Sequence, residues 1–289
     1  MTTPREVLRE AKDLPTLPTA VARLSELIED KSAGASQFEK VVKPDPALTA
    51  NLLRLANSPF FGLRREVTSV RQAIALMGIN RVFELAASAS FKQVLPKKIP
   101  GYEIEASAFW LHSIAVGVMA EKLADTTRLA APEMIFTAGL LHDIGKLAIS
   151  SILVAKSQDV LGQMWENDIS FVESEKTALG TDHAEVGELM AQEWNLPCQV
   201  EWAARWHHEP NEAPEDVNQS LVDLVHIADG MAHLVGFGAD VGELGRSLEG
   251  DPMERLGIGV QDVEQTAGAT IGQIREMGEN LSGLQGGLR

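Results

Sequence analysis

The chain has 289 residues, of which 45% are hydrophobic and 23% charged, the ordinary composition of a soluble globular protein with a large core. Its formal net charge of −16 argues against a general nucleic-acid binder, although a local metal cluster would still attract a small nucleotide into one pocket. Cys198 is the only cysteine, which excludes an intramolecular disulfide, and neither a secretory leader nor a run of about 18 apolar residues is present. We therefore expect a cytoplasmic protein that contacts neither nucleic acid nor a membrane.

The first third of the chain predicts short helices in close succession. Asp45 and Pro46 form a cap and first-turn pair, and the stretch Ser69–Gln72 is typical of a capping box, opening a helix that Gly78 closes. Apolar residues recur at helical spacing between these signals. The pattern indicates five short helices between about residues 17 and 95.

A joint follows at Leu95–Gly101, where two prolines and a glycine interrupt the helical pattern. Strand patterns are almost absent along the whole chain, so the sequence predicts an all-α protein. We expect longer helices over residues 105–124, 132–151, 182–195, 197–209 and 219–235, and one amphipathic helix in the glycine-rich tail. The predicted parts are an N-terminal extension (1–16), two helical subdomains (17–95 and 96–235) and a C-terminal extension (236–289).

All seven histidines lie in the second half of the chain, at His112, His142, His183, His207, His208, His226 and His233. Helical spacing turns seven side chains toward the interior: His112, His142, His183, His207, His208, Asp143 and Asp229. One buried histidine is more often a packed core residue than a ligand, but five histidines and two carboxylates together require a cation. Because seven ligands exceed one tetrahedral ion, we expect a pair of ions bridged by an aspartate.

The ligand chemistry narrows the choice of metal. Imidazole combined with carboxylate suits transition metals and is too rich in nitrogen for calcium or magnesium. We expect two transition-metal ions, with Fe or Mn favoured and Ni or Zn as alternatives.

Several motifs occur in a recognisable order between about Leu14 and Val235. They are LPTLPTAVARLSELIED, KVVKPDPALTANLLRLANSPFFG, SVRQAIALMGINRVFELAAS, SAFWLHSIAVGVMAEKLA and GLLHDIGKLAIS. In these stretches the chain resembles the HDOD family, a branch of the HD superfamily of metal-dependent phosphohydrolases. The resemblance implies an all-α fold in which an N-terminal helical subdomain packs on an HD-like, metal-binding helical core.

The resemblance also implies how the ligands divide. One ion would be held by His112, His142, Asp143 and Asp229. The other would be held by His183, His207 and His208, with Asp143 bridging the two ions.

Three further polar residues, Lys146, His226 and His233, lie outside this ligand set. Lys146 matches the lysine that follows the HD pair in the related HD-GYP phosphodiesterases, so it either meets a phosphate oxygen or the bridging water, or is a solvated helix charge. His226 and His233 match no ligand position, and we expect them to pack in the core or on the surface rather than orient Asp229.

One departure from the HD-GYP pattern bears on function. There, a loop with a Gly-Tyr-Pro signature follows the paired histidines and contacts the nucleotide, whereas here Glu209 runs into the acidic stretch Pro210–Asp216. We therefore expect a signalling or regulatory HDOD protein with an intact binuclear metal site, protein partners and room for a small phosphate-containing ligand. The alternative is a phosphohydrolase acting on a nucleotide or cyclic (di)nucleotide, with Asp143 and Lys146 as catalytic residues. A purely structural metal site is a third hypothesis.

Overall fold

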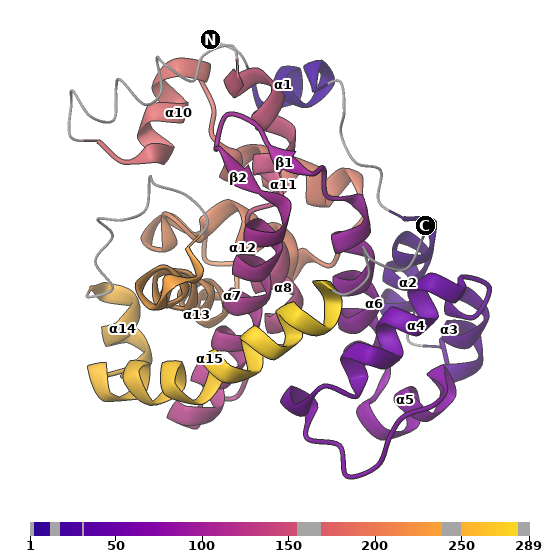
Figure 1. Ribbon diagram of the computed structural model, residues 1–289. Coiled ribbons are helices and arrows are strands. Elements are labelled where there is room, and N and C mark those ends of the chain that lie inside the picture. The colour runs from indigo at the N-terminus through magenta and orange to yellow at the C-terminus, as the bar shows by residue number, and fades with distance from the viewer. Residues whose placement is uncertain (1–2, 12–17, 31, 155–168, 239–249, 283–289) are drawn as a thin grey trace. The chain divides into compact units, whose positions relative to one another are not determined.

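The computed structural model describes residues 3–11, 18–30, 32–154, 169–238 and 250–282 (Figure 1). The chain divides into two compact units, one formed by Met1–Pro15 with Pro96–Gly268 and the other by Thr16–Leu95 with Ala269–Arg289. The division along the chain falls at the proline-containing joint, and the finer four-part division stays a prediction. Each unit is described separately below.

Helices account for most of the described residues, which confirms the predicted all-α class. The described strands form a two-stranded antiparallel ribbon in which β1 (Lys98–Ile99) pairs with β2 (Ile104–Glu105). This ribbon occupies the predicted joint, so the prolines there mark the entry to a short hairpin.

The unit that contains residues 16–95 has the five expected short helices. They are α2 (Thr19–Glu29), α3 (Ala35–Val42), α4 (Pro46–Ala56), α5 (Val70–Met77) and α6 (Ile79–Val94), with a 3₁₀ turn η1 (Pro59–Phe61) after α4. The longest of these, α6, packs against the other four. Asp45 caps α4 by accepting from the Leu48 backbone N–H. Half of the predicted capping box at Ser69 is present, because Ser69 accepts from Gln72 but the Gln72 side chain accepts from Thr68 instead.

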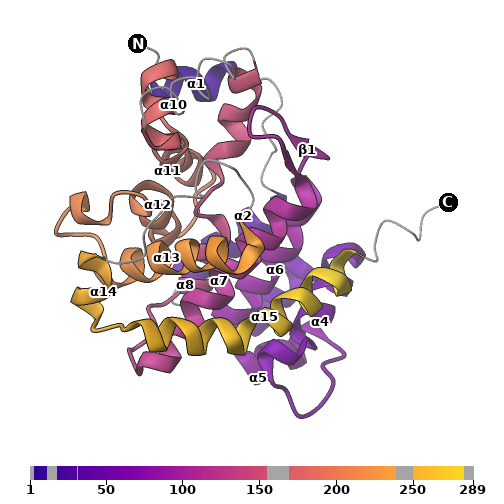
Figure 2. The same cartoon turned by 60° about the vertical axis from the view of Figure 1, so that its left-hand side comes forward.

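The other unit carries the histidines and is built from longer helices. Its elements are α1 (Pro4–Glu10), α7 (Ala106–Thr127), α8 (Ile135–Leu141), α10 (Phe171–Leu179), α11 (His183–Glu193), α12 (Cys198–Trp206), η2 (Pro210–Glu212), α13 (Gln219–Ala232), η3 (His233–Phe237) and α14 (Asp251–Leu256). Helix α7 packs on α8 and α13, and α12 packs on α8, α11 and α13 (Figure 2). Helix α15 (Val260–Ser282) begins in this unit and ends in the other. The sequence patterns did not predict α10 or α14.

The helix predicted over residues 132–151 is interrupted at its centre. Helix α8 ends at Leu141, and the helical backbone resumes at residues 145–154. Between them the backbone tightens, since Ile144 N–H donates to Leu141 at 3.1 Å and Lys146 N–H donates to Asp143 at 3.0 Å. The prediction of one continuous helix was therefore wrong, and His142 and Asp143 lie in a tight turn between two helical segments.

Glycines allow the helices around this turn to approach closely. A Cβ on Gly145 would lie 1.9 Å from the carbonyl oxygen of His183 and 2.6 Å from the backbone nitrogen of Gly187. A Cβ on Gly139 would lie 2.9 Å from the backbone of Gly117 on α7. The absence of side chains lets α7 lie against α8 at Gly139, and lets α11 lie at Gly145, directly after the turn that holds His142 and Asp143.

Two helical stretches, Ile135–Val154 and Gln219–Phe237, are long and apolar enough to cross a membrane by composition alone. In the structure 83% and 67% of these two windows are buried inside the protein, so most of their residues belong to its core.

Candidate metal centre

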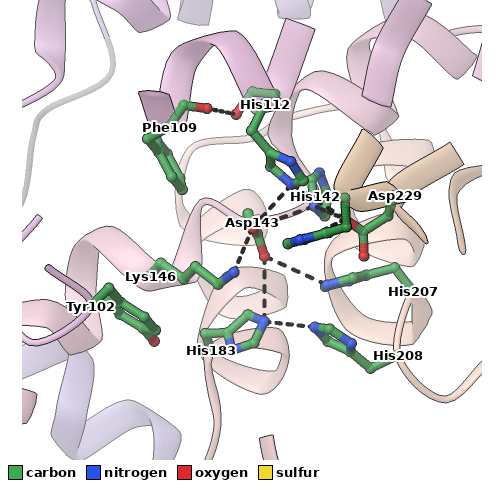
Figure 3. Close-up of polar contacts among 12 residues, drawn as sticks. Tyr102, Phe109, His112, His142, Asp143, Lys146, His183, His207, His208 and Asp229 are labelled. Carbon is green, nitrogen blue, oxygen red and sulfur yellow. Dashed lines mark hydrogen bonds and ion pairs between the residues drawn. The ribbon is translucent and has the colours of Figure 1, made fainter. Parts of the chain in front are cut away.

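The structure brings together all seven side chains that the sequence proposed as ligands (Figure 3). They come from α7 (His112), the turn after α8 (His142 and Asp143), the start of α11 (His183), the end of α12 (His207 and His208) and α13 (Asp229). Six of the seven are buried, and His208 is half-buried.

One group of these residues, named here the first cluster, consists of His112, His142, Asp143 and Asp229. The Nε2 atom of His112 lies 3.3 Å from Asp229 Oδ1 and 3.8 Å from Asp143 Oδ2. The Nε2 atom of His142 lies 3.4 Å from Asp143 Oδ2 and 3.7 Å from Asp229 Oδ1. Two imidazoles and two carboxylates therefore face one point.

The second cluster consists of Asp143, His183, His207 and His208. Asp143 Oδ1 lies 3.3 Å from His183 Nε2 and 3.6 Å from His207 Nε2. The Nε2 atoms of His183 and His208 are 2.9 Å apart. Asp143 thus belongs to both clusters and turns a different carboxylate oxygen toward each.

Backbone and carboxylate acceptors fix the orientation of the histidine rings. The Nδ1 atom of His142 lies 2.7 Å from the Gly139 carbonyl oxygen, and that of His207 lies 2.8 Å from the Ala203 carbonyl oxygen. A carbonyl oxygen only accepts, so each Nδ1 carries a proton and Nε2 is the ring atom that faces the cluster.

The donor set fits a bound cation on physical grounds. Among the described residues, His112 Nε2, His142 Nε2 and Asp143 Oδ1 are buried and have no hydrogen-bond partner. Leaving such atoms unsatisfied costs on the order of 1–3 kcal/mol each. A transition-metal ion in each cluster would satisfy them, and mixed imidazole and carboxylate ligands suit that class of ion.

Burial and neighbouring charges set the protonation of the site. Burial on its own raises the pKa of Asp143, but the Lys146 ammonium and His142 hold that pKa well below its usual range. Burial lowers the pKa of His207 to about 4, which keeps that ring neutral. Burial also opposes the charged form of His183, yet the Glu175 carboxylate raises its pKa to about 10. A metal ion that bound His183 would therefore have to displace a proton.

Lys146 is buried beside the clusters, so the interpretation of a solvated helix charge is wrong. Its Nζ atom lies 2.7 Å from Asp143 Oδ2 and 5.7 Å from the centre of the Tyr102 ring. The ammonium offsets the buried charge of Asp143 from one side while the histidines face it from the other. Its role toward a phosphate stays a prediction.

Glu175 and Tyr102 are part of the site, and the sequence patterns did not reveal either. Glu175 is fully buried on α10, and its Oε2 atom accepts from His183 Nδ1 at 2.7 Å and from the His183 backbone N–H at 3.0 Å. The hydroxyl of Tyr102, from the hairpin, donates to the other oxygen of Glu175. The capping box of Ser170 and Glu173 would have indicated α10, but nothing local points Glu175 toward His183.

The two histidines without a family role also contact the site. His226 Nδ1 donates to the His207 backbone carbonyl at 2.7 Å and so supports the end of α12. His233 Nε2 lies 3.6 Å from Asp229 Oδ1, and the His233 ring centre lies 4.9 Å from that of His112. The expectation that His233 only packs in the core or on the surface missed this position next to the first cluster.

The acidic stretch that follows the paired histidines is tied to neighbouring helices. Asn211 donates to Asp251 at 2.8 Å and accepts from Arg255 at 2.7 Å, both on α14. Arg255 in turn forms two hydrogen bonds, 2.9 and 2.6 Å long, with the buried carboxylate of Asp223 on α13. The stretch is therefore held in place by α13 and α14.

The chain is similar to a known protein family in sequence and to solved structures in fold. Residues 14–210 match the model of the HDOD domain. An uncharacterised protein of Treponema pallidum is 28% identical over 220 residues, which are 75% of this chain and 42% of that protein. This chain thus spans less than half the length of that relative.

Two solved structures are similar over nearly the whole chain. An HDOD domain protein of unknown function from Geobacter sulfurreducens has 25% identity and a TM-score of 0.76, with coverage of 96% of this chain and 95% of that one. A protein named "Putative phosphohydrolase" from Shewanella amazonensis SB2B has 26% identity and a TM-score of 0.73, with coverage of 95% and 97%.

Proposed function

This chain belongs to the HDOD domain family, and on that premise we propose that it is a signalling or regulatory protein whose HD-like core holds two transition-metal ions. The observation that carries the proposal is the position of the Asp143 carboxylate between the two clusters. Its Oδ2 faces His112 and His142, and its Oδ1 faces His183 and His207. A carboxylate placed in this way can bridge a pair of metal ions.

The first ion would be held by His112, His142, Asp143 and Asp229, and the second by His183, His207, His208 and Asp143. Fe and Mn are the favoured metals, with Ni and Zn as alternatives, because the ligands are imidazole and carboxylate. When bound, such ions supply positive charge that neutralises buried carboxylates and attracts an anionic ligand.

Two features favour regulation over turnover. Lys146 is buried, and its ammonium is already paired with Asp143 Oδ2 at 2.7 Å. The stretch Pro210–Asp216 carries acidic side chains and is tied to α14 through Asn211, so it does not offer a nucleotide a positive surface. We propose that the metal-bound core binds a small phosphate-containing ligand or stabilises one conformation of the protein. Protein partners would then bind according to that state.

The second candidate function is a metal-dependent phosphohydrolase acting on a nucleotide or cyclic (di)nucleotide. His208 supports it, because this half-buried histidine leaves the second cluster the more accessible of the two. The Shewanella amazonensis structure, by its name, supports it as well. In this case Asp143 would position the ions, and Lys146 would stabilise charge on the phosphate.

Elemental analysis of the protein purified without chelators tests the metal proposal. We expect two transition-metal ions per chain, and none or one in Asp143→Asn, because the amide cannot bridge two cations as a carboxylate does. Asp216→Asn is the matched control, since Asp216 is exposed outside the clusters. Wild-type protein without transition metal would show that the ligand assignment is wrong.

A turnover assay separates the two functions. Metal-loaded protein is incubated with cyclic dinucleotides, cyclic mononucleotides and nucleotides, and the products are separated by chromatography. The regulatory proposal expects no metal-dependent hydrolysis. Hydrolysis that is present in wild type and in Asp125→Asn, an exposed position on α7, but lost in Asp143→Asn would establish the phosphohydrolase instead.

A further inference from the structure

The turn η3 (His233–Phe237), which continues directly from α13, lies against the first cluster. It falls outside residues 14–210, which match the family model, and outside the ligand pattern that the family resemblance implies. Two of its groups nevertheless lie at His112, namely the His233 imidazole and the Phe237 carbonyl oxygen. The turn η3 therefore contributes both a side chain and a backbone group next to a candidate metal ligand.

His233 is placed as a metal ligand would be. It lies one helical turn after Asp229, and its Nε2 atom is 3.6 Å from Asp229 Oδ1. One ligand atom each of His112, Asp229 and His233 lies within 4.8 Å of the others, as close together as those of His112, His142 and Asp143 are. His233 therefore places a third imidazole beside the first cluster, next to Asp229.

The backbone of η3 supports the same arrangement. Gly236 adopts a φ of +85°, which glycine accepts without strain and which turns the chain back toward α7. The Phe237 carbonyl oxygen then accepts from His112 Nδ1 at 3.2 Å, which directs the His112 Nε2 lone pair into the cluster. The same short segment thus supplies one candidate ligand and orients another.

Gly238 limits how far the His233 ring can move. A Cβ built on Gly238 would lie 2.4 Å from His233 Nδ1. The backbone of Gly238 has φ −59° and ψ 138°, which any residue can adopt, so the contact with the imidazole is the obstacle to a larger side chain. The position of the His233 ring can therefore be perturbed without removing the ring.

We propose that His233 is a further ligand of the first metal ion, an inference that rests on the proposed binuclear site. The first ion would then have five protein ligands, His112, His142, Asp143, Asp229 and His233, and the second ion four, Asp143, His183, His207 and His208. Fewer protein ligands leave more coordination positions for water or a bound anion. By this ligand count, the second ion is the one that would accept the phosphate-containing ligand.

Metal content and metal release test this inference without any activity assay. Wild type and His233→Ala are compared by elemental analysis before and after a graded chelator challenge, and by the rate of metal loss to the chelator. We expect His233→Ala to lose one ion at least about tenfold faster than wild type while the other ion is lost at the wild-type rate. Leu234→Ala is the control, because Leu234 is a neighbouring exposed side chain on the same turn.

Gly238→Ala, alone and combined with His233→Ala, distinguishes a loss of metal ligation from misfolding. Gly238→Ala keeps His233 but displaces its ring, so we expect the same selective acceleration of metal loss. Once His233→Ala has removed the ring, adding Gly238→Ala should change the rate little. Circular dichroism melts show whether each variant remains folded.

The outcomes separate the inference from the proposed function. Two ions in wild type and unchanged release in folded His233→Ala and Gly238→Ala would overturn the role of His233 and leave the binuclear site standing. Wild-type protein without transition metal would overturn both. Equal acceleration of both ions in His233→Ala would assign His233 to general packing and overturn the inference.

Discussion

The two oxygens of Asp143 face different histidines, and Lys146 lies against one of them at 2.7 Å. At the scale of single residues, this arrangement makes a fully buried carboxylate tolerable, because positive or polar groups surround it. Glu175 performs a related task for His183 by accepting from its Nδ1 atom. The arrangement of the site thus depends on Glu175, which lies outside the two clusters, as well as on the carboxylates within them.

Replacing Glu175 with glutamine should weaken the second metal site. The neutral amide loses the charged hydrogen bond to His183 Nδ1, and such outer contacts typically contribute about 10–100-fold to metal affinity. Competition with a metal-binding dye measures the change. Glu193→Gln, an exposed position on α11, is the control, and equal affinities for both variants would contradict the prediction.

Lys92, on α6, should make stability depend on pH in the alkaline range. Burial, with a contribution from Arg54, lowers its pKa from 10.5 to about 8, so the folded state holds fewer protons than the unfolded state between these values. The buried Lys92 ammonium destabilises the folded state, and this destabilisation is complete below about pH 8. As the pH rises from about 8 toward about 10.5, the destabilisation disappears and the free energy of unfolding increases.

The replacement Lys92→Met checks this sign. The variant should have a higher Tm than wild type at pH 7, and the difference should shrink at about pH 10. Thermal melts of both proteins across this range measure it. A difference that stays constant with pH would show that the titration of Lys92 does not contribute.

At the scale of elements, the interruption between α8 and residues 145–154 positions the histidine–aspartate pair. A continuous helix would carry His142 and Asp143 about 100° apart around its axis, whereas the tight turn lets both reach the clusters. The close crossing at Gly145 then brings His183, at the start of α11, within 3.3 Å of Asp143.

Gly145→Ala tests the close crossing. The added methyl group meets the His183 backbone, so α11 must move, which we expect to cost about 1–3 kcal/mol of unfolding free energy and to weaken metal binding. Gly272→Ala on α15 is the matched control, because no atom lies within 4 Å of its added Cβ and alanine favours the helix by up to about 1 kcal/mol. Urea denaturation and elemental analysis report both effects, and a Gly145→Ala protein as stable as Gly272→Ala would refute the explanation.

At the scale of the whole molecule, every residue of the two clusters comes from the unit formed by Met1–Pro15 and Pro96–Gly268. The unit that contains Thr16–Leu95 supplies none of the proposed ligands among its described residues. With a net charge of −16 the molecule repels anions at long range, so an anionic ligand would depend on positive charge held locally at the clusters.

Removal of metal should lower the thermal stability of the molecule. Ions that bind only the folded state stabilise it by about 2.7 kcal/mol when present at 100 times their dissociation constant. Differential scanning calorimetry with and without chelator should therefore show a lower Tm for the metal-free wild type and a much smaller change for Asp143→Asn. Bound metal whose removal leaves the Tm unchanged would contradict this coupling.

The sequence by itself determined most of the helical elements, although not α10, α14 or the break after Leu141, because caps, breakers and apolar periodicity are local properties of consecutive residues. It predicted the helices near residues 106–127, 183–193 and 219–232, and it selected the seven histidines and aspartates that the structure brings together. Family resemblance, not periodicity, divided these residues between two ions.

Only the tertiary structure decided which groups surround the candidate ligands. Glu175, Tyr102 and His233 contact the site from α10, the hairpin and η3, and Lys146 is buried rather than solvated. The physical reason is that these contacts join segments far apart in sequence or depend on a break in helical geometry. Periodicity states which face of a helix is buried, whereas packing decides what that face meets.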